Sequence, residues 1–133
     1  MTIKRISVSM LVAILILAIC VPALANGFFI NRASPVFASA NAYLYKDGEA
    51  GFSCTTSGQY NSVTLKSASY QYLSNGKWVY GGSLSKPTKF ISAKSSYKGS
   101  ITYTMPSGKT CRLVAVFDAD GTTTTAYSSS ISF

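Results

Sequence analysis

From about residue 40 onward, apolar and polar residues alternate in short runs, the pattern of β-strands with one buried face. The first two runs predict strands over residues 40–45 and 49–56, joined by a turn at residues 46–48. Side chains alternate along a strand, so the second strand has three apolar side chains on one face: Ala50, Phe52 and Cys54. We therefore predict that Cys54 points into the core.

The segment "VTLKSASYQYLSNGKWVY" predicts a hairpin. A strand ends at Leu73, a turn follows at Asn75-Gly76, and a short strand runs over residues 78–80. Asn-Gly between two β-forming runs is the strongest short-range signal for a hairpin. The next residues, 81–96, are rich in Gly, Ser and Lys and include Pro87, so we predict a long connection with one edge strand around Phe90.

The most apolar predicted strand covers residues 111–117, "CRLVAVF". A strand over residues 100–105 and a turn at 106–108 come before it, and the Thr- and Ser-rich end of the chain supplies a closing strand. One face of the 111–117 strand has Cys111, Leu113, Ala115 and Phe117, and the other face has two valines. A strand that is apolar on both faces is expected in the middle of a sheet.

These runs predict an all-β fold, a small immunoglobulin-like β-sandwich of about seven short strands within residues 26–133. Strong helix formers are scarce and do not recur at helical spacing. Two immunoglobulin hallmarks are missing, because Lys109 replaces the tyrosine two residues before Cys111 and Trp78 follows the hairpin turn. The pattern therefore predicts a sandwich without fixing an immunoglobulin topology.

The first 25 residues predict a secretory signal peptide. Lys4 and Arg5 precede an apolar run of about a dozen residues, and Ala23-Leu24-Ala25 supplies small residues for cleavage after Ala25. The run is short of the roughly 20 residues that a membrane-spanning helix needs. A lipoprotein signal ending at Cys20 is the other alternative, but Ile19 stands where a small residue is required. We expect a secreted protein, extracellular or associated with the cell wall, with no membrane span in its mature chain.

Removal of the signal peptide leaves two cysteines, Cys54 and Cys111. An exported chain meets conditions in which cysteines can pair, so we predict a disulfide between them. Closing the loop of 57 positions is worth on the order of 4 kcal/mol in the chain-entropy model. The alternative is that both are buried thiols that pack as small apolar side chains.

Three segments support a resemblance to known proteins: "RAS" at residues 32–34, "YLSNGKW" at residues 72–78 and "GKTCRLVAVFDADG" at residues 108–121. On these segments the chain resembles a group of small secreted, β-rich proteins of Gram-positive bacteria that have no assigned activity. Cys111 stands where an aromatic residue is expected in that group. The resemblance implies secretion and a small β fold, and it implies no activity.

The mature chain offers little material for catalysis, because it has no histidine and only four acidic residues. All four lie in or beside predicted turns, where Asp is favoured for backbone reasons: Asp47, Glu49, Asp118 and Asp120. The motif "DADG" resembles the start of a calcium loop, but the later ligands are absent. We predict no catalytic residues, no metal site and no cofactor, and a protein that is not an enzyme.

Charge is more informative. The expected mature chain has ten basic residues against four acidic ones, a net charge of +6, and no acidic residue lies between positions 50 and 117. A basic surface attracts anionic partners, so we predict a ligand-binding surface made of Lys86, Lys89, Lys94, Lys98, Phe90, Tyr97, Trp78 and Tyr80. The alternative is that the lysines provide solubility and protect sheet edges, and that the aromatic side chains cover the core.

The leading functional hypothesis is therefore a secreted, non-enzymatic binding module that recognises an anionic cell-wall polymer or a surface protein. Nucleic acid is not a favoured partner, and the sequence does not determine the oligomeric state. The alternative is a cationic antimicrobial or toxin-like factor, although the mature chain lacks an amphipathic basic helix. A hydrolase that uses one of the four acidic residues is the third hypothesis.

Overall fold

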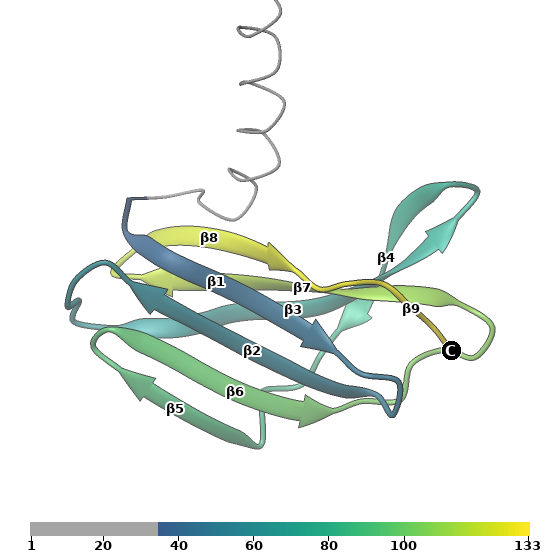
Figure 1. Ribbon diagram of the computed structural model, residues 1–133, viewed down its shortest axis with the longest axis horizontal. Helices are drawn as coiled ribbons and strands as arrows, with labels where there is room; N and C mark the ends of the chain where they lie inside the picture. The colour runs from purple at the N-terminus through teal and green to yellow at the C-terminus, as the bar shows by residue number, and fades with distance from the viewer. Residues whose placement is uncertain (1–34) are drawn as a thin grey trace, which may run out of the picture. The chain divides into compact units, whose positions relative to one another are not determined.

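The chain folds into antiparallel β-strands, as the alternating pattern predicts. The structure is a computed structural model, and it describes residues 35–133 (Figure 1). These residues form nine strands: β1 (Phe37–Leu44), β2 (Glu49–Thr56), β3 (Val63–Ser74), β4 (Lys77–Ser83), β5 (Lys89–Ala93), β6 (Ser96–Thr102), β7 (Thr110–Ala119), β8 (Thr122–Tyr127) and β9 (Ile131–Ser132).

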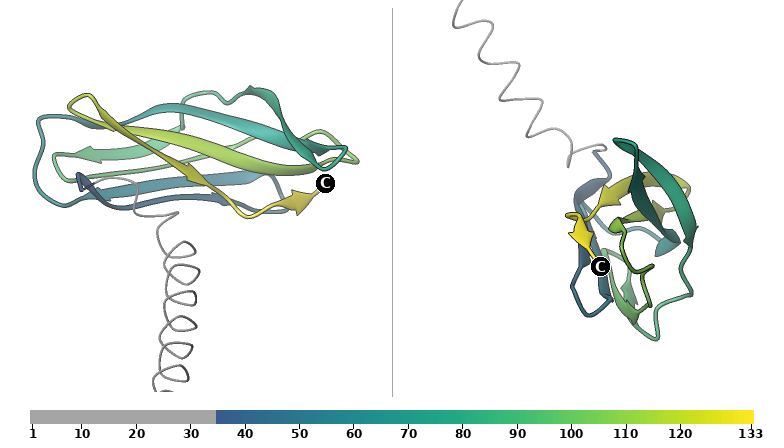
Figure 2. Two further views of the ribbon diagram at one scale, coloured as in Figure 1. Left: turned by 90° about the horizontal axis from the view of Figure 1, so that it is seen from above. Right: turned by 90° about the vertical axis from the view of Figure 1, so that its right-hand side faces the viewer.

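The strands pair into two sheets that lie face to face as two layers (Figures 1 and 2). The first sheet has the order β1-β2-β6-β5. The second sheet has the order β4-β3-β7-β8, and β9 also pairs with β7. Every pairing in both sheets is antiparallel. The predicted all-β fold with two packed sheets is therefore confirmed.

The core lies between the sheets and is built from the faces that the sequence predicts. In β2 the side chains of Ala50, Phe52 and Cys54 are at most 2% exposed. In β7 four alternate side chains have no exposed surface at all: Cys111, Leu113, Ala115 and Phe117. Burial of apolar surface at these positions is the main force that holds the two sheets together.

The strand that is apolar on both faces, β7, lies between β3 and β8. It therefore occupies the middle of the second sheet, as predicted. The pairing of β7 with β8 ends at Tyr127. In the next residue, Ser128, a side-chain oxygen accepts a hydrogen bond from β7 in place of a backbone carbonyl. The N–H of Leu113 donates a hydrogen bond to Ser128 Oγ at 2.8 Å. The predicted closing strand is consequently divided into β8 and β9.

Several turns contain residues with positive φ, a conformation that few residues adopt, and two of these turns matter most for the fold. Asn75 and Gly76 both have positive φ, at 51° and 75°, so the predicted hairpin turn between β3 and β4 is present. Gly48, in the β1–β2 turn, has φ of 82°, and a Cβ there would stand 2.2 Å from the carbonyl oxygen of Tyr103. Only glycine fits this turn, because the chain leaving β6 passes directly against it.

The prediction is wrong in one region, residues 81–105. There β4 continues to Ser83, β5 follows after a short connection, and β6 covers Ser96–Thr102 in place of the predicted strand over residues 100–105. The tight turn between β5 and β6 consists of Lys94 and Ser95, which carry no Gly, Pro or Asn signal. The expected edge strand around Phe90 is present as β5, at the edge of the first sheet.

The strand order can be compared with that of immunoglobulin-type sandwiches, in which strands A-B-E-D form one sheet and strands C-F-G the other. With the strands named in chain order and β4 as C′, the two sheets here read A-B-E-D and C′-C-F-G. The side chains that mark those domains are absent, since Trp78 lies on β4 and the two cysteines are free. The likeness is one of strand order alone.

The predicted signal peptide, its cleavage position after Ala25, and Cys20 all lie outside the described residues. Within residues 35–133 the structure has no helix of the length and hydrophobicity required to span a lipid bilayer.

Candidate ligand-binding groove

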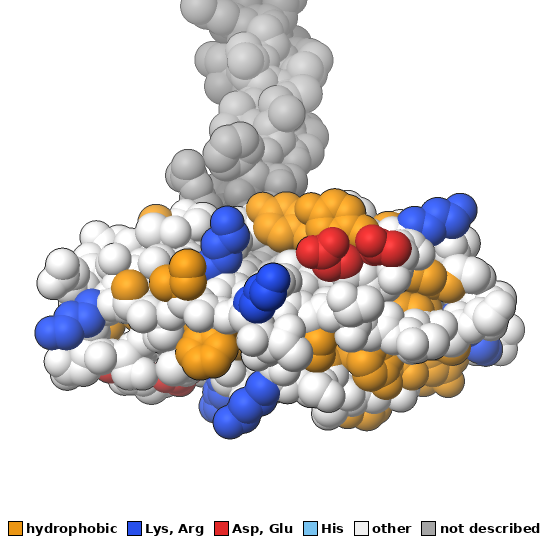
Figure 3. All heavy atoms as spheres, turned by 90° about the horizontal axis from the view of Figure 1, so that it is seen from below, with side chains coloured by type: hydrophobic (Ala, Val, Ile, Leu, Met, Phe, Trp, Pro, Cys, Tyr) orange, Lys and Arg blue, Asp and Glu red, His pale blue; other side chains and the backbone are white. Residues whose placement is uncertain are grey.

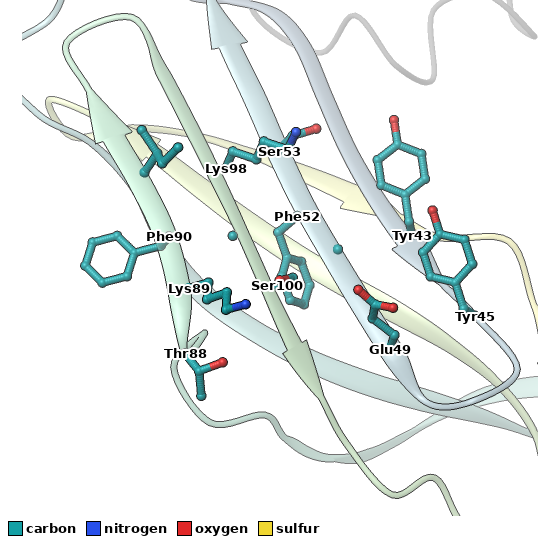
Figure 4. Close-up of a pocket in the computed structure, with 13 residues that line it drawn as sticks. Tyr43, Tyr45, Glu49, Phe52, Ser53, Thr88, Lys89, Phe90, Lys98 and Ser100 are labelled. Carbon is teal, nitrogen blue, oxygen red and sulfur yellow. The ribbon is translucent and has the colours of Figure 1, made fainter.

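A groove crosses the outer face of the first sheet, the face turned away from the core (Figure 4). Its volume is about 750 Å³, within the range of sites that hold small ligands. All four strands of the first sheet contribute to it, together with Tyr45 just after β1 and Thr88 just before β5. The lining residues are Tyr43, Tyr45, Glu49, Gly51, Phe52, Ser53, Thr88, Lys89, Phe90, Ile91, Lys98, Gly99 and Ser100.

Small outward-facing residues form the floor of the groove. Gly51 and Ser53 alternate in β2 with buried Phe52, so they face outward. Gly51 is paired with Ser100 of β6, which also faces outward. The middle of the sheet therefore has no large side chain on this face, and the larger side chains of the neighbouring strands stand around it as walls.

Two lysines form the wall nearest the edge strand. Lys89 of β5 is paired with Ser100, and Lys98 of β6 is paired with Ile91, so both side chains lie on the outer face. Neither ammonium group has a hydrogen-bond or ion-pair partner among residues 35–133. Figure 4 shows both side chains over the groove. Two positive charges are therefore available to a ligand.

Two tyrosines form the opposite wall. Tyr43 lies in β1, and Tyr45 is the first residue after β1. Their side chains are 46% and 54% exposed. Tyr43 is the cross-strand partner of Gly51, and its Cδ2 lies 3.5 Å from where a Cβ on that glycine would stand. The ring thus lies beside the glycine. Both rings are seen nearly face-on in the view onto the sheet, with Glu49 beside them (Figure 4).

Side chains of both charges lie on the face seen from below. The basic side chains are spread over the molecule, and two acidic side chains lie together beside a hydrophobic patch, with a basic side chain next to them (Figure 3). Within the groove, Glu49 is the one carboxylate and it lies on the tyrosine side, at the start of β2. The groove therefore has a cationic side and an aromatic side.

The structure brings some of the predicted ligand-binding residues together and separates others. Lys89 and Lys98 turn their side chains into the groove, whereas Phe90 borders it from β5 with its ring directed away, stacked on Tyr97 (Figure 4). Lys86 and Lys94 lie just before and just after β5, outside the lining. Lys89 and Lys98 belong to β5 and β6, so much of the predicted long connection over residues 81–96 is a pair of strands.

Tyr97 does not belong to the binding surface, because it is a core side chain that is only 5% exposed. Its ring stacks on Phe90, with centroids 6.3 Å apart and planes at 14°, and its centroid lies 6.1 Å from that of Phe117. The alternation of β6 turns Tyr97 inward and Lys98 outward. The sequence pattern missed this because it placed Tyr97 in a loop.

Trp78 and Tyr80 lie on β4, in the second sheet, whereas Lys89 and Lys98 lie in the first. The Arg112 guanidinium carbon lies 4.3 Å from the centroid of the Trp78 ring and 4.5 Å from that of the Tyr127 ring. Arg112 Nε also donates a hydrogen bond to Gln71 Oε1 at 2.9 Å. Trp78 is therefore part of a cation–π contact within the second sheet, and the predicted site is divided between two faces.

Sequence reasoning missed Tyr43, Tyr45 and Glu49. The signal for the tyrosines was present in "ANAYLYK", because Ala42 and Leu44 alternate with them. Once Ala42 and Leu44 are buried in β1, the tyrosines must face outward as an exposed aromatic pair. No local signal shows that lysines from β5 and β6 share their face.

The predicted disulfide is absent, since Cys54 and Cys111 are both free and buried. Cys54 is paired with Tyr97, whose ring packs against Phe117. Cys111 lies six residues before Phe117 on the extended strand β7, a separation of about 20 Å. A disulfide needs Cα atoms within about 7 Å, so the two cysteines are at opposite ends of the sandwich and cannot pair in this fold.

Burial controls the chemistry of both thiols. Removal from solvent raises the pKa of Cys54 from 9.0 to about 11, although the backbone of Tyr97 partly opposes the shift. Burial also raises the pKa of Cys111, and Lys109 opposes that shift. Both side chains are therefore neutral thiols at physiological pH and do not act as nucleophiles.

The acidic residues of the turns accept hydrogen bonds from the backbone. Asp120 accepts from the N–H groups of Asn61 and Ser62, at 2.8 and 2.9 Å. Asp118 Oδ1 accepts from the N–H of Gly121 at 3.1 Å, and Asp47 Oδ1 accepts from the N–H of Glu49 at 2.9 Å. Residues 35–133 contain no group of three or more His, Cys, Asp or Glu side chains that could hold a metal ion.

Comparison of the chain with models of protein families, with curated proteins and with solved structures gives no match.

Proposed function

We propose that the protein is a secreted, non-enzymatic binding module that holds an anionic polymer of the cell envelope in the groove of the first sheet. The observation that carries the proposal is the placement of Lys89 and Lys98. These residues are nine positions apart in the sequence, yet the register of β5 and β6 sets both on one face, over a floor of small residues.

Electrostatics supports an anionic ligand. Both ammonium groups lack a carboxylate partner in the described part of the chain, so a ligand would not need to displace an existing ion pair. Lys86 and Lys94 flank the same edge strand and add to the positive potential there. Binding through such a surface depends on salt, because counterions screen exposed charges beyond a Debye length of about 8 Å at physiological ionic strength.

Secretion is part of the proposal and is supported by the pattern of residues 1–25. The surroundings of a secreted bacterial protein include anionic wall polymers, which present repeated negative charges on an extended chain. A groove that is open along a sheet face suits an extended ligand. Residues 35–133 contain both sheets and the core between them, so the chain from residue 26 onward is suitable for the test.

The test is co-sedimentation of residues 26–133 with purified cell walls at low and high salt, before and after the anionic polymers are stripped. We expect binding at low salt that is lost on stripping. The Lys89→Gln/Lys98→Gln variant should bind about tenfold more weakly or worse, since a lysine near an anionic surface contributes about 1 kcal/mol.

The matched control is Lys66→Gln/Lys77→Gln, which makes the same change in net charge on exposed positions of β3 and β4 in the second sheet. If the control weakens binding as much as the groove variant, net charge rather than the groove is responsible and the proposal is wrong. No sedimentation in any condition would also contradict it and would favour a protein partner.

A further inference from the structure

The groove combines features that a purely electrostatic site does not need. We infer that its ligand is an acidic polysaccharide, whose neutral sugar rings stack on Tyr43 and Tyr45 while its acidic groups reach Lys89 and Lys98. This inference rests on the proposed function and narrows it to one class of anionic polymer.

The aromatic wall suits the apolar faces of sugar rings. Tyr43 and Tyr45 are about half exposed, and neither has a close aromatic partner among the described residues. The Tyr43 ring lies beside Gly51, with its Cδ2 3.5 Å from where a Cβ on that glycine would stand, and both rings turn a face toward the viewer in Figure 4. Large aromatic side chains held in this way bury substantial apolar area at low entropic cost when a ligand stacks on them.

The floor suits sugar hydroxyl groups. The hydroxyl groups of Ser53 and Ser100 line the groove and have no hydrogen-bond partner in residues 35–133. A serine hydroxyl both donates and accepts, so it matches a ligand hydroxyl in either role. A polyphosphate chain has acceptors only, so it would use the donor role of these serine hydroxyl groups and leave their acceptor role unused.

The charges are arranged for a ligand that is acidic at one place and neutral at another. In the order β1-β2-β6-β5, the tyrosine strand and the strand of Lys89 are three strand spacings apart, about 14 Å. Glu49 lies on the tyrosine side and repels negative charge there. A polymer with a charge on every unit would place one beside Glu49, whereas a polysaccharide with spaced acidic groups need not.

The test measures binding of residues 26–133 to three polymers at one salt concentration by titration calorimetry. Hyaluronan alternates a carboxylate sugar with a neutral sugar, polyphosphate has a charge on every unit and no sugar ring, and dextran is neutral. We expect hyaluronan to bind more tightly than either of the others. The Tyr43→Ala/Tyr45→Ala variant should weaken hyaluronan binding about tenfold and leave polyphosphate binding unchanged.

A matched control is Tyr80→Ala/Tyr127→Ala, which removes two exposed tyrosines from the second sheet and should not change binding. Loss of the Tyr43 ring uncovers Gly51, so circular dichroism is used to check that the Tyr43→Ala/Tyr45→Ala variant is folded. Tyr45→Ala alone leaves that contact in place and should still weaken hyaluronan binding about threefold.

The outcomes separate this inference from the proposed function. If Lys89→Gln/Lys98→Gln weakens binding of both charged polymers but the tyrosine variants bind hyaluronan like the wild type, the polysaccharide inference is wrong and the proposed function stands. Tighter binding of polyphosphate than of hyaluronan leads to the same conclusion. If the lysine variant binds both polymers like the wild type, both proposals are wrong.

Discussion

Cys54 shows how a single side chain can be placed correctly by sequence and still have a different role. Alternation along β2 predicts its inward direction, and the side chain is 2% exposed. Alternation could not predict whether Cys54 forms a disulfide, because it gives the face on which a residue lies and not its position along the sandwich. Burial makes it a neutral thiol with a raised pKa.

The raised pKa of Cys54 leads to a prediction for alkaline pH. The folded state holds the proton up to about pH 11, whereas the unfolded chain releases it near 9.0. The unfolded state therefore binds fewer protons between these values, and the free energy of unfolding falls as pH rises from 9 to 11. Wild type should lose about 2 kcal/mol more than Cys54→Ala over this range in urea unfolding.

Thr55→Ala is the control, since Thr55 is the exposed neighbour on the outer face of the same strand. Its effect on the free energy of unfolding should not change with pH. An unfolding free energy of Cys54→Ala that falls between pH 9 and 11 as steeply as that of wild type would show that other groups are responsible. Tyr70, Tyr97 and Cys111, whose pKa values are also raised, would then be the candidates.

At the scale of elements, β5 decides whether the groove has a cationic wall. All five of its residues are exposed, and it pairs with β6 alone. One side-chain hydrogen bond fastens it to the other sheet, from Ser92 Oγ to the carbonyl oxygen of Val63 at 2.8 Å. An edge strand with little buried surface is expected to open more readily than the central strands.

Ser92→Ala should therefore loosen β5 without unfolding the sandwich. Loss of this partly buried hydrogen bond costs about 1 kcal/mol, and the carbonyl group of Val63 loses its partner. Hydrogen exchange should become about fivefold faster in residues 89–93 and stay unchanged in β7. Ser100→Ala, on the neighbouring strand and without a hydrogen-bond partner in the described residues, should leave exchange in β5 as in the wild type.

If exchange in β5 does not respond to Ser92→Ala, the stacking of Phe90 on Tyr97 rather than the hydrogen bond anchors the strand. The two anchors lie on the inner face of β5 and leave Lys89 and Ile91 on the outer face. The element is therefore held from the core side while its basic side chain remains available to a ligand.

For the whole molecule, stability comes from the core between the sheets and not from a covalent link. The largest fully buried side chains belong to β2, β3 and β7, which lie in both sheets: Phe52, Phe117, Leu113, Val63, Cys54 and Cys111. Apolar burial of this kind contributes about 25 cal/mol for each Å² removed from water. A chain of this size can be stable on that basis alone.

Reductant should therefore have no effect on the stability of residues 26–133. The melting temperature with and without dithiothreitol should agree within error, and the unfolded protein should show two free thiols in a colorimetric titration. The physical reason is their placement: Cys54 is paired with Tyr97, which packs on Phe117, whereas Cys111 lies about 20 Å from Phe117 along β7. A lower melting temperature in dithiothreitol, with no free thiols before reduction, would contradict this fold.

Several features of the molecule were determined by the sequence alone. The alternation in β2 and β7 predicts their faces, the two-sided hydrophobicity of β7 predicts its central place, and Asn75-Gly76 predicts the hairpin. These are local signals, because a strand's period and a turn's φ angles depend only on neighbouring residues. The residues of β5 and β6 carry weaker local signals, and their bounds were accordingly missed.

The groove and the separation of the cysteines were decided by the tertiary structure. Tyr43, Gly51, Ser100 and Lys89 come from four different strands and meet only through the order β1-β2-β6-β5. Trp78 and Tyr80 belong to β4 in the other sheet, and Cys111 lies about 20 Å along β7 from Phe117, which packs on the partner of Cys54, Tyr97. Local pattern fixes which way a side chain points, but the pairing of distant strands fixes what it points beside, and burial of both sheets together selects that pairing.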